Sequence, residues 1–94
     1  TIHSRSQSHI MRMLEDAAEY LLLNVIRELA KNYKVSNETI HFMASFYRFS
    51  FAGVIFDWIE KGMHENPQKI VDQVAILMQG TFPSALERFE KAKM

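Results

Sequence analysis

Apolar residues recur at three- and four-residue steps along most of the chain, which is the spacing of an amphipathic α-helix. A first helix is predicted from about Ile10 to about Tyr33. Its apolar residues fall on one broad face: Ile10, Met11, Leu14, Ala17, Ala18, Leu21, Leu22, Val25, Ile26 and Leu29. The Ser- and His-rich opening stretch is expected to be partly disordered, with Ser4, Ser6 or Ser8 as the N-cap. No segment shows the alternation typical of strands, so the pattern predicts an all-α chain.

Capping residues indicate where the second helix begins and ends. Ser36 is suited to cap its first turn, with Val35 and Ile40 at the two positions of a hydrophobic staple. Gly62 suits the left-handed position that follows a helix, and Met63 would then fold back on the last turn. The second helix is therefore expected to occupy residues 37–61.

A third and a fourth helix follow. Asn66 is a natural N-cap and Pro67 a natural first residue for the third helix. Its apolar face contains Ile70, Val71, Val74, Leu77 and Met78. Gly80 and Pro83 are expected to interrupt this helix. The tail from Ser84 onward predicts a final short helix that is polar enough to fray.

The second helix has two apolar sides. On a helical wheel at about 100° per residue, one side carries Ile40, Ala44, Tyr47, Phe51, Val54, Ile55 and Trp58. The opposite side carries Phe42, Phe46, Phe49, Gly53 and Phe56. Two polar seams separate these sides, one with His41, Ser45 and Arg48 and the other with Ser50, Asp57 and Lys61. A helix with apolar residues on two opposite sides needs other helices packed against both of these sides.

Two arrangements could provide this cover. Within one copy, the first and third helices could enclose the second in a three-helix unit. Alternatively, one side of the second helix packs with part of the third against another subunit, because leaving it exposed would forfeit on the order of 10 kcal/mol. A chain of 94 residues also has a poor ratio of core to surface. We predict an antiparallel helical bundle of three main helices that dimerises through a four-helix interface.

Composition and charge narrow the class of function. The chain has 11 basic and 11 acidic residues, so no polyanion partner is expected. It has no cysteine, which excludes disulfides and thiol chemistry. The longest purely apolar run, VAILM, is too short to cross a bilayer. We expect a cytoplasmic protein that does not contact a membrane.

Motifs for catalysis or metal binding are weak. Glu38 and His41 share one helical face, but a di-iron site needs two such pairs and two further glutamates. Serine, histidine and aspartate occur without the spacing of a nucleophile elbow. We therefore expect no enzyme activity, no metal and no cofactor. Arg48 and Asp57 point to opposite sides of the second helix and are expected to reach solvent, with pairing across a two-fold interface as the alternative.

The order of features in the stretch FYRFSFAGVIFDWIEKGMHENPQKIVDQV is more specific than generic helix packing. An aromatic-rich helix with an Ala-Gly pair is followed by Trp58, by IEKGM and by a proline-started amphipathic helix. This order resembles the C-terminal region of tetracycline-repressor (TetR) family transcription regulators, nearest to the branch that includes the dihydroxyacetone-kinase activators. The resemblance covers roughly residues 10–78. It implies that the last two long helices form a four-helix dimer bundle and that the remaining helices enclose an effector pocket.

Further expectations concern partners and sites. The N-terminal helix-turn-helix of such regulators is absent, so residues 1–94 are expected to form a single helical domain, with DNA contacted only through that missing part. A homodimer is expected, with an interface formed by Tyr47, Phe51, Ile55, Trp58, Val74 and Met78. A small apolar or aromatic effector is expected to contact Tyr20, Asn24, Phe42, Phe46 and Phe49, the phenylalanines facing the first helix. The two faces of the second helix could be exchanged. A stand-alone helical interaction module without a small-molecule ligand is the alternative function.

Overall fold

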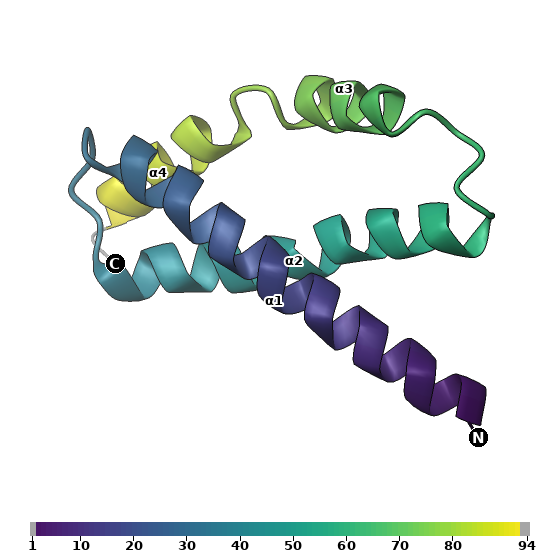
Figure 1. Ribbon diagram of the computed structural model, residues 1–94. Helices are drawn as coiled ribbons and strands as arrows, with labels where there is room; N and C mark the ends of the chain where they lie inside the picture. Colours follow the sequence, from purple (N-terminus) through teal and green to yellow (C-terminus); the bar gives the residue numbers. More distant parts are fainter. Residues whose placement is uncertain (1, 93–94) are drawn as a thin grey trace.

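The computed structural model describes residues 2–92, with side chains from Ser8 onward. Four helices occupy this range, α1 (Ile2–Ala30), α2 (Asn37–Glu60), α3 (Pro67–Met78) and α4 (Thr81–Ala92). No strand occurs within it, which confirms the all-α prediction. Helix α1 crosses α2, α3 runs back in the opposite direction to α2, and α4 returns to the end of the molecule where α1 stops (Figure 1).

Helix α1 begins much earlier than predicted. It starts at Ile2 rather than near Ile10, so Ser4, Ser6 and Ser8 lie within the helix and none of them is its N-cap. The physical reason is that no glycine or proline occurs between residues 2 and 30 to interrupt the helical backbone. The N-terminal part of α1 diverges from α2 and projects beyond the rest of the molecule (Figure 1).

The predicted N-caps of α2 and α3 are confirmed. The Ser36 hydroxyl accepts a hydrogen bond from the backbone N–H of Thr39, at 3.1 Å. The Asn66 carboxamide oxygen accepts one from the backbone N–H of Gln68, at 2.9 Å, and Pro67 follows as the first helical residue. Each cap satisfies a backbone donor that has no partner inside its helix.

The end of α2 is a Schellman motif, as the sequence predicts. Gly62 has a φ of +86°, which is in the left-handed region. Its N–H donates to the carbonyl of Ile59, and the N–H of Met63 donates to the carbonyl of Trp58, both at 3.0 Å. This local geometry turns the chain sharply away from the axis of α2.

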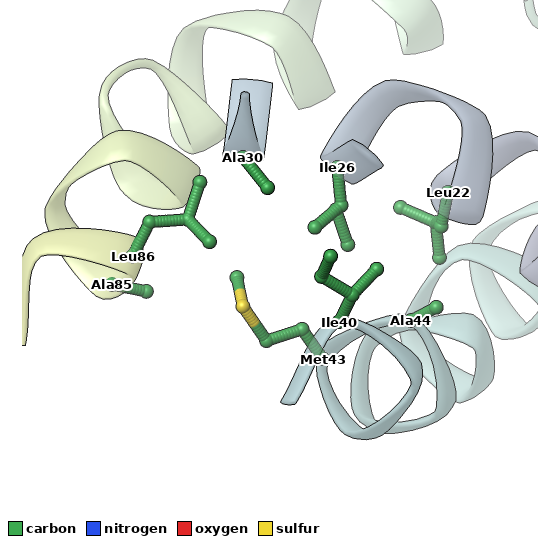
Figure 2. Close-up of a cluster of buried hydrophobic side chains, with 8 residues drawn as sticks. All are labelled: Leu22, Ile26, Ala30, Ile40, Met43, Ala44, Ala85 and Leu86. Atoms are coloured by element: carbon green, nitrogen blue, oxygen red, sulfur yellow. The ribbon is translucent and has the colours of Figure 1, made fainter. Parts of the chain in front are cut away.

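The core lies where α1, α2 and α4 meet (Figure 2). It consists of Leu22, Ile26 and Ala30 from α1, Ile40, Met43 and Ala44 from α2, and Ala85 and Leu86 from α4. Ile26, Ala44 and Leu86 are fully buried. The helix that closes the core is thus α4, whereas α3 contributes no buried residue in the described chain.

The prediction that the C-terminal helix is a polar, fraying tail was wrong. Its few apolar residues share one face, and Phe82 and Phe89 pack against the core beside the two buried residues. The Glu90 carboxylate also accepts a hydrogen bond from the backbone N–H of Lys34, at 2.7 Å. Pro83 does not interrupt the chain, because it lies in the first turn of α4, where its missing N–H costs nothing. Gly80, with a φ of +77°, does separate α3 from α4.

The seam of α2 that contains Arg48 faces α1 rather than solvent. The Arg48 guanidinium donates to the Glu19 carboxylate of α1 at 2.5 Å, and the two side chains are only 28% and 26% exposed. The expectation of a solvent-facing Arg48 was therefore wrong, because α1 crosses α2 on this side. Asp57 is exposed, as expected, and its hydrogen bond to Lys61, at 2.9 Å, raises the pKa of the Lys61 ammonium.

Two glycine substitutions should have opposite effects on stability. A Cβ at Gly53 would meet nothing within 4 Å, so Gly53→Ala should raise the free energy of unfolding by about 1 kcal/mol through better helix propensity. A Cβ at Gly62 would lie 2.8 Å from Nε2 of His64 on a left-handed backbone, so Gly62→Ala should lower it by about 1–2 kcal/mol. Urea unfolding measures both, and a loss of stability in Gly53→Ala would contradict the open surroundings of this residue.

The Arg48–Glu19 pair should contribute more than an exposed pair. Glu19→Gln leaves a half-buried guanidinium without its counter-charge and should lower the free energy of unfolding by about 1–2 kcal/mol. The control is Glu28→Gln, which removes the largely exposed pair with Lys31 and should lower the free energy of unfolding by less than about 0.5 kcal/mol. Equal losses in urea unfolding would show that the contact with α1 does not depend on this pair.

Candidate functional site

The connection between α2 and α3 sets these two helices antiparallel. After the Schellman turn, the Trp58 indole N–H donates to the backbone carbonyl of Glu65, at 2.6 Å. Asn66 then caps α3 one residue later. The first turn of α3 is therefore held close to the last turn of α2, and the apolar faces of both helices border the same space.

An apolar groove with a volume of about 360 Å³ lies between α2 and α3. The α2 residues that line it are Tyr47, Ser50, Phe51, Val54 and Ile55, and the α3 residues are Ile70, Val71, Val74, Leu77 and Met78. Ser50 is the one polar residue among them. Leu77 remains 79% exposed and Val71 57%, so the α3 wall of the groove is open to solvent.

The two walls of this groove differ in how they pack against the rest of the molecule. On α2, Tyr47 and Phe51 pack against the buried core, and the Tyr47 ring contacts the Phe82 ring edge-on at 5.2 Å between centroids. Helix α3 has no such anchor, because none of its residues is buried. The groove therefore combines an aromatic wall that is packed on the core with an aliphatic wall that has no buried residue.

A second cavity, of about 340 Å³, lies at the corner where α2 ends and α3 begins, and we call it the corner cavity. Its lining residues are Val54, Asp57, Trp58, Lys61, His64, Glu65, Ile70 and Gln73. Val54 and Ile70 belong to both the corner cavity and the groove. The two spaces are thus adjacent, one apolar and the other partly polar.

The residues predicted for a dimer interface come together in the structure. Tyr47, Phe51 and Ile55 line one wall of the groove, while Val74 and Met78 line the other. Trp58 lies in the adjoining corner cavity. The other lining residues, Ser50 and Val54 on α2 and Ile70, Val71 and Leu77 on α3, were not among the predicted site residues. The three on α3 belong to the apolar face that the helical spacing predicts.

The five residues predicted for effector binding are not brought together into one cavity. Tyr20, Asn24, Phe42, Phe46 and Phe49 are all exposed. The phenylalanines do not face α1, because α1 packs on the other sides of α2, over Ala44 and Ala52. Phe42 lines a separate hollow of about 420 Å³ with Ser36, Glu38, Thr39 and Phe89. The Arg48 guanidinium lies 4.7 Å from the centroid of the Phe49 ring.

Metal-binding groups and membrane-spanning helices are both absent from the described range, residues 2–92. No group of three or more histidine, aspartate or glutamate residues is placed there to hold a metal ion. His41, the imidazole of the Glu38–His41 pair, instead lies 3.3 Å from the guanidinium of Arg27 on α1. None of the four helices described has the length and apolar character needed to span a bilayer.

A comparison with protein-family models shows what kind of protein the chain resembles. A family model described as the C-terminal region of a transcriptional regulator, of TetR type, matches residues 1–80. The matched region takes in α1, α2 and α3, and so includes the groove and the corner cavity. No curated protein and no solved structure matches the chain at a significant level.

Proposed function

The chain belongs to the TetR-type family of transcriptional regulator C-terminal regions, and on that premise we propose that it is the homodimerising, effector-sensing domain of a DNA-binding regulator. DNA is contacted, in this proposal, by an N-terminal helix-turn-helix that the 94 residues do not include. The effector is a small apolar or aromatic molecule. The branch that we propose is that of the dihydroxyacetone-kinase activators.

The apolar groove between α2 and α3 is the observation that supports a dimer. Its α3 wall has no covering element within the described chain, although it presents several large aliphatic side chains. The full burial of one such side chain contributes about 1.5–3 kcal/mol of favourable free energy. A second copy related by a two-fold axis would place its own α3 over this groove, and the same patch would then serve both copies.

The resulting interface would contain four helices, α2 and α3 from each copy. We propose that Tyr47, Phe51, Ile55, Val74 and Met78 lie inside it, with Trp58 at its margin. Their side chains are aromatic or aliphatic, which suits the desolvated centre of an interface. The exposed pair of Asp57 and Lys61 would lie at the rim of the interface, where charged groups stay hydrated and their desolvation costs little free energy.

Effector sensing requires that the ligand bind two arrangements of the dimer with different affinity. Helix α3 is the element that would differ between two such arrangements, because it has no buried residue of its own. A change in the angle between α3 and α2 would alter how two copies sit against each other. The distance between the two attached DNA-binding domains would then increase or decrease.

The row of exposed rings on the far side of α2 favours a second candidate function. Phe42, Phe46 and Phe49 are exposed and lie outside the groove. A helical interaction module that senses no small molecule would use this row to hold a partner protein. This alternative predicts a dimer that binds no small ligand at all.

Two charge substitutions test which face forms the dimer. The wild-type chain should sediment as a dimer at roughly 10 µM, a concentration well above the Kd of an interface worth about 8 kcal/mol or more. Leu77→Glu should raise the dissociation constant of the dimer at least about 30-fold, because a buried carboxylate would replace an apolar interface side chain. Leu77 is 79% exposed in one copy, so the helical circular dichroism should not change.

Phe46→Glu is the matched control, because Phe46 is also on an exposed surface, at 62%, but lies outside the groove. It should leave the dimer intact. A wild-type chain that sediments as a monomer would overturn the dimer proposal. Loss of the dimer in Phe46→Glu but not in Leu77→Glu would show that the two faces of α2 are exchanged.

A further inference from the structure

The corner cavity between the end of α2 and the start of α3 has both apolar and polar walls, unlike the groove beside it. We propose that it binds a small uncharged molecule with an aromatic or branched apolar body and a hydroxyl or amide head. This inference rests on the proposed effector-sensing function and assigns it a location. At about 340 Å³, the cavity lies within the usual size range of small-molecule sites.

The apolar wall of the corner cavity is formed by Val54, Trp58 and Ile70. The indole N–H of Trp58 is already bonded to the carbonyl of Glu65, at 2.6 Å, so the ring is fixed and offers a ligand its apolar surface. An indole face pairs well with another aromatic ring. The body of the ligand therefore belongs on this side.

The charges of the polar wall are balanced. Lys61 pairs with Asp57 at 2.9 Å, and Glu65 lies 4.0 Å from the Lys69 ammonium. A charged ligand would add a charge without a free counter-ion. A hydroxyl or amide head, in contrast, could donate to the Asp57 carboxylate and accept from the Lys61 ammonium without disturbing this balance.

Two further polar side chains at the cavity are available for hydrogen bonds. Neither His64 nor Gln73 has a hydrogen-bond partner among residues 8–92, and both lining side chains carry a donor and an acceptor. The position of His64 depends on Gly62, because a Cβ there would lie 2.8 Å from the imidazole Nε2. The left-handed glycine that ends α2 thus also leaves room for a polar group at the cavity.

A ligand in the corner cavity would touch both helices that we propose for the dimer. Asp57 lies in the last turn of α2 and Lys61 is its C-cap, while Ile70 and Gln73 belong to α3. Because α3 has no buried residue, its angle to α2 is set mainly by the loop between them. A bridging ligand would fix that angle and thereby couple binding to the geometry of the groove.

The test uses Trp58 as a probe, since it is the one tryptophan of the sequence and lines the cavity. Its fluorescence is titrated with benzyl alcohol, benzoate and benzylamine, which share a ring and differ in the charge of the head. Benzyl alcohol should give a saturable change, and the two charged probes should bind at least about tenfold more weakly because of the unpaired charge they bring. Equal responses to all three probes, or no saturable response to the alcohol, would overturn the proposal.

Four variants test whether benzyl alcohol binds in the corner cavity. His64→Leu and Gln73→Leu should each weaken binding of benzyl alcohol by about fivefold, the effect of one lost hydrogen bond. The matched controls, His41→Leu on α2 and Gln68→Leu on α3, lie outside the cavity and should bind as the wild type does. Equal weakening in a variant and its control, with unchanged circular dichroism, would refute binding at the corner cavity.

Sedimentation of the same samples separates this inference from the proposed dimer. A dimer whose Trp58 fluorescence does not respond would overturn the ligand site and leave the dimer proposal standing. A monomer that binds benzyl alcohol with the expected variant pattern would support the ligand site and overturn the dimer.

Discussion

The crossing of α1 over α2 is the contact on which the rest of the structure depends. Small side chains are buried there, Ala18 on α1 and Ala44 and Ala52 on α2, and the Arg48–Glu19 pair ties the helices together beside them. Because the two axes diverge from this crossing, the packed core extends only toward one end of the molecule, where Leu86 of α4 closes it (Figures 1 and 2). Much of the apolar surface of α2 is consequently left without cover from α1.

Helix α3 lies beside the apolar surface of α2 that α1 leaves uncovered. The helix turns back along α2 and presents an aliphatic face to it, yet none of its side chains becomes buried. The chain thus contains a well-packed part, made by α1, α2 and α4, and a helix that borders an open groove. In the proposed dimer a partner surface buries the groove, and a ligand at the corner cavity would contact both of the helices that border it.

Local features of the fold could be predicted from the sequence, whereas its long-range contacts could not. The caps at Ser36 and Asn66 and the left-handed Gly62 depend on neighbouring residues, and each was predicted correctly. The role of α4 depends on where the chain returns after α3, which the pattern within α4 does not encode. Arg48 was likewise expected to reach solvent, and its pairing with Glu19 depends on a long-range contact that the pattern of α2 does not contain. Half of the groove residues were predicted as an interface because each lies on the apolar face of α2 or of α3. The corner cavity, in contrast, needs the turn at Gly62 to form.

In the proposed dimer, α3 of one copy fills the groove of the other, and intermolecular NOEs in a mixed sample would detect this contact. One half of the sample carries labelled methyl groups and the other half labelled aromatic rings, so that contacts between the two labels arise only between copies. If α3 fills the groove of its partner, intermolecular NOEs are expected from the methyls of Val74 and Leu77 to the ring of Phe51, and none to the ring of Phe46. NOEs to Phe46 in place of Phe51, or no intermolecular NOE at all, would contradict this arrangement.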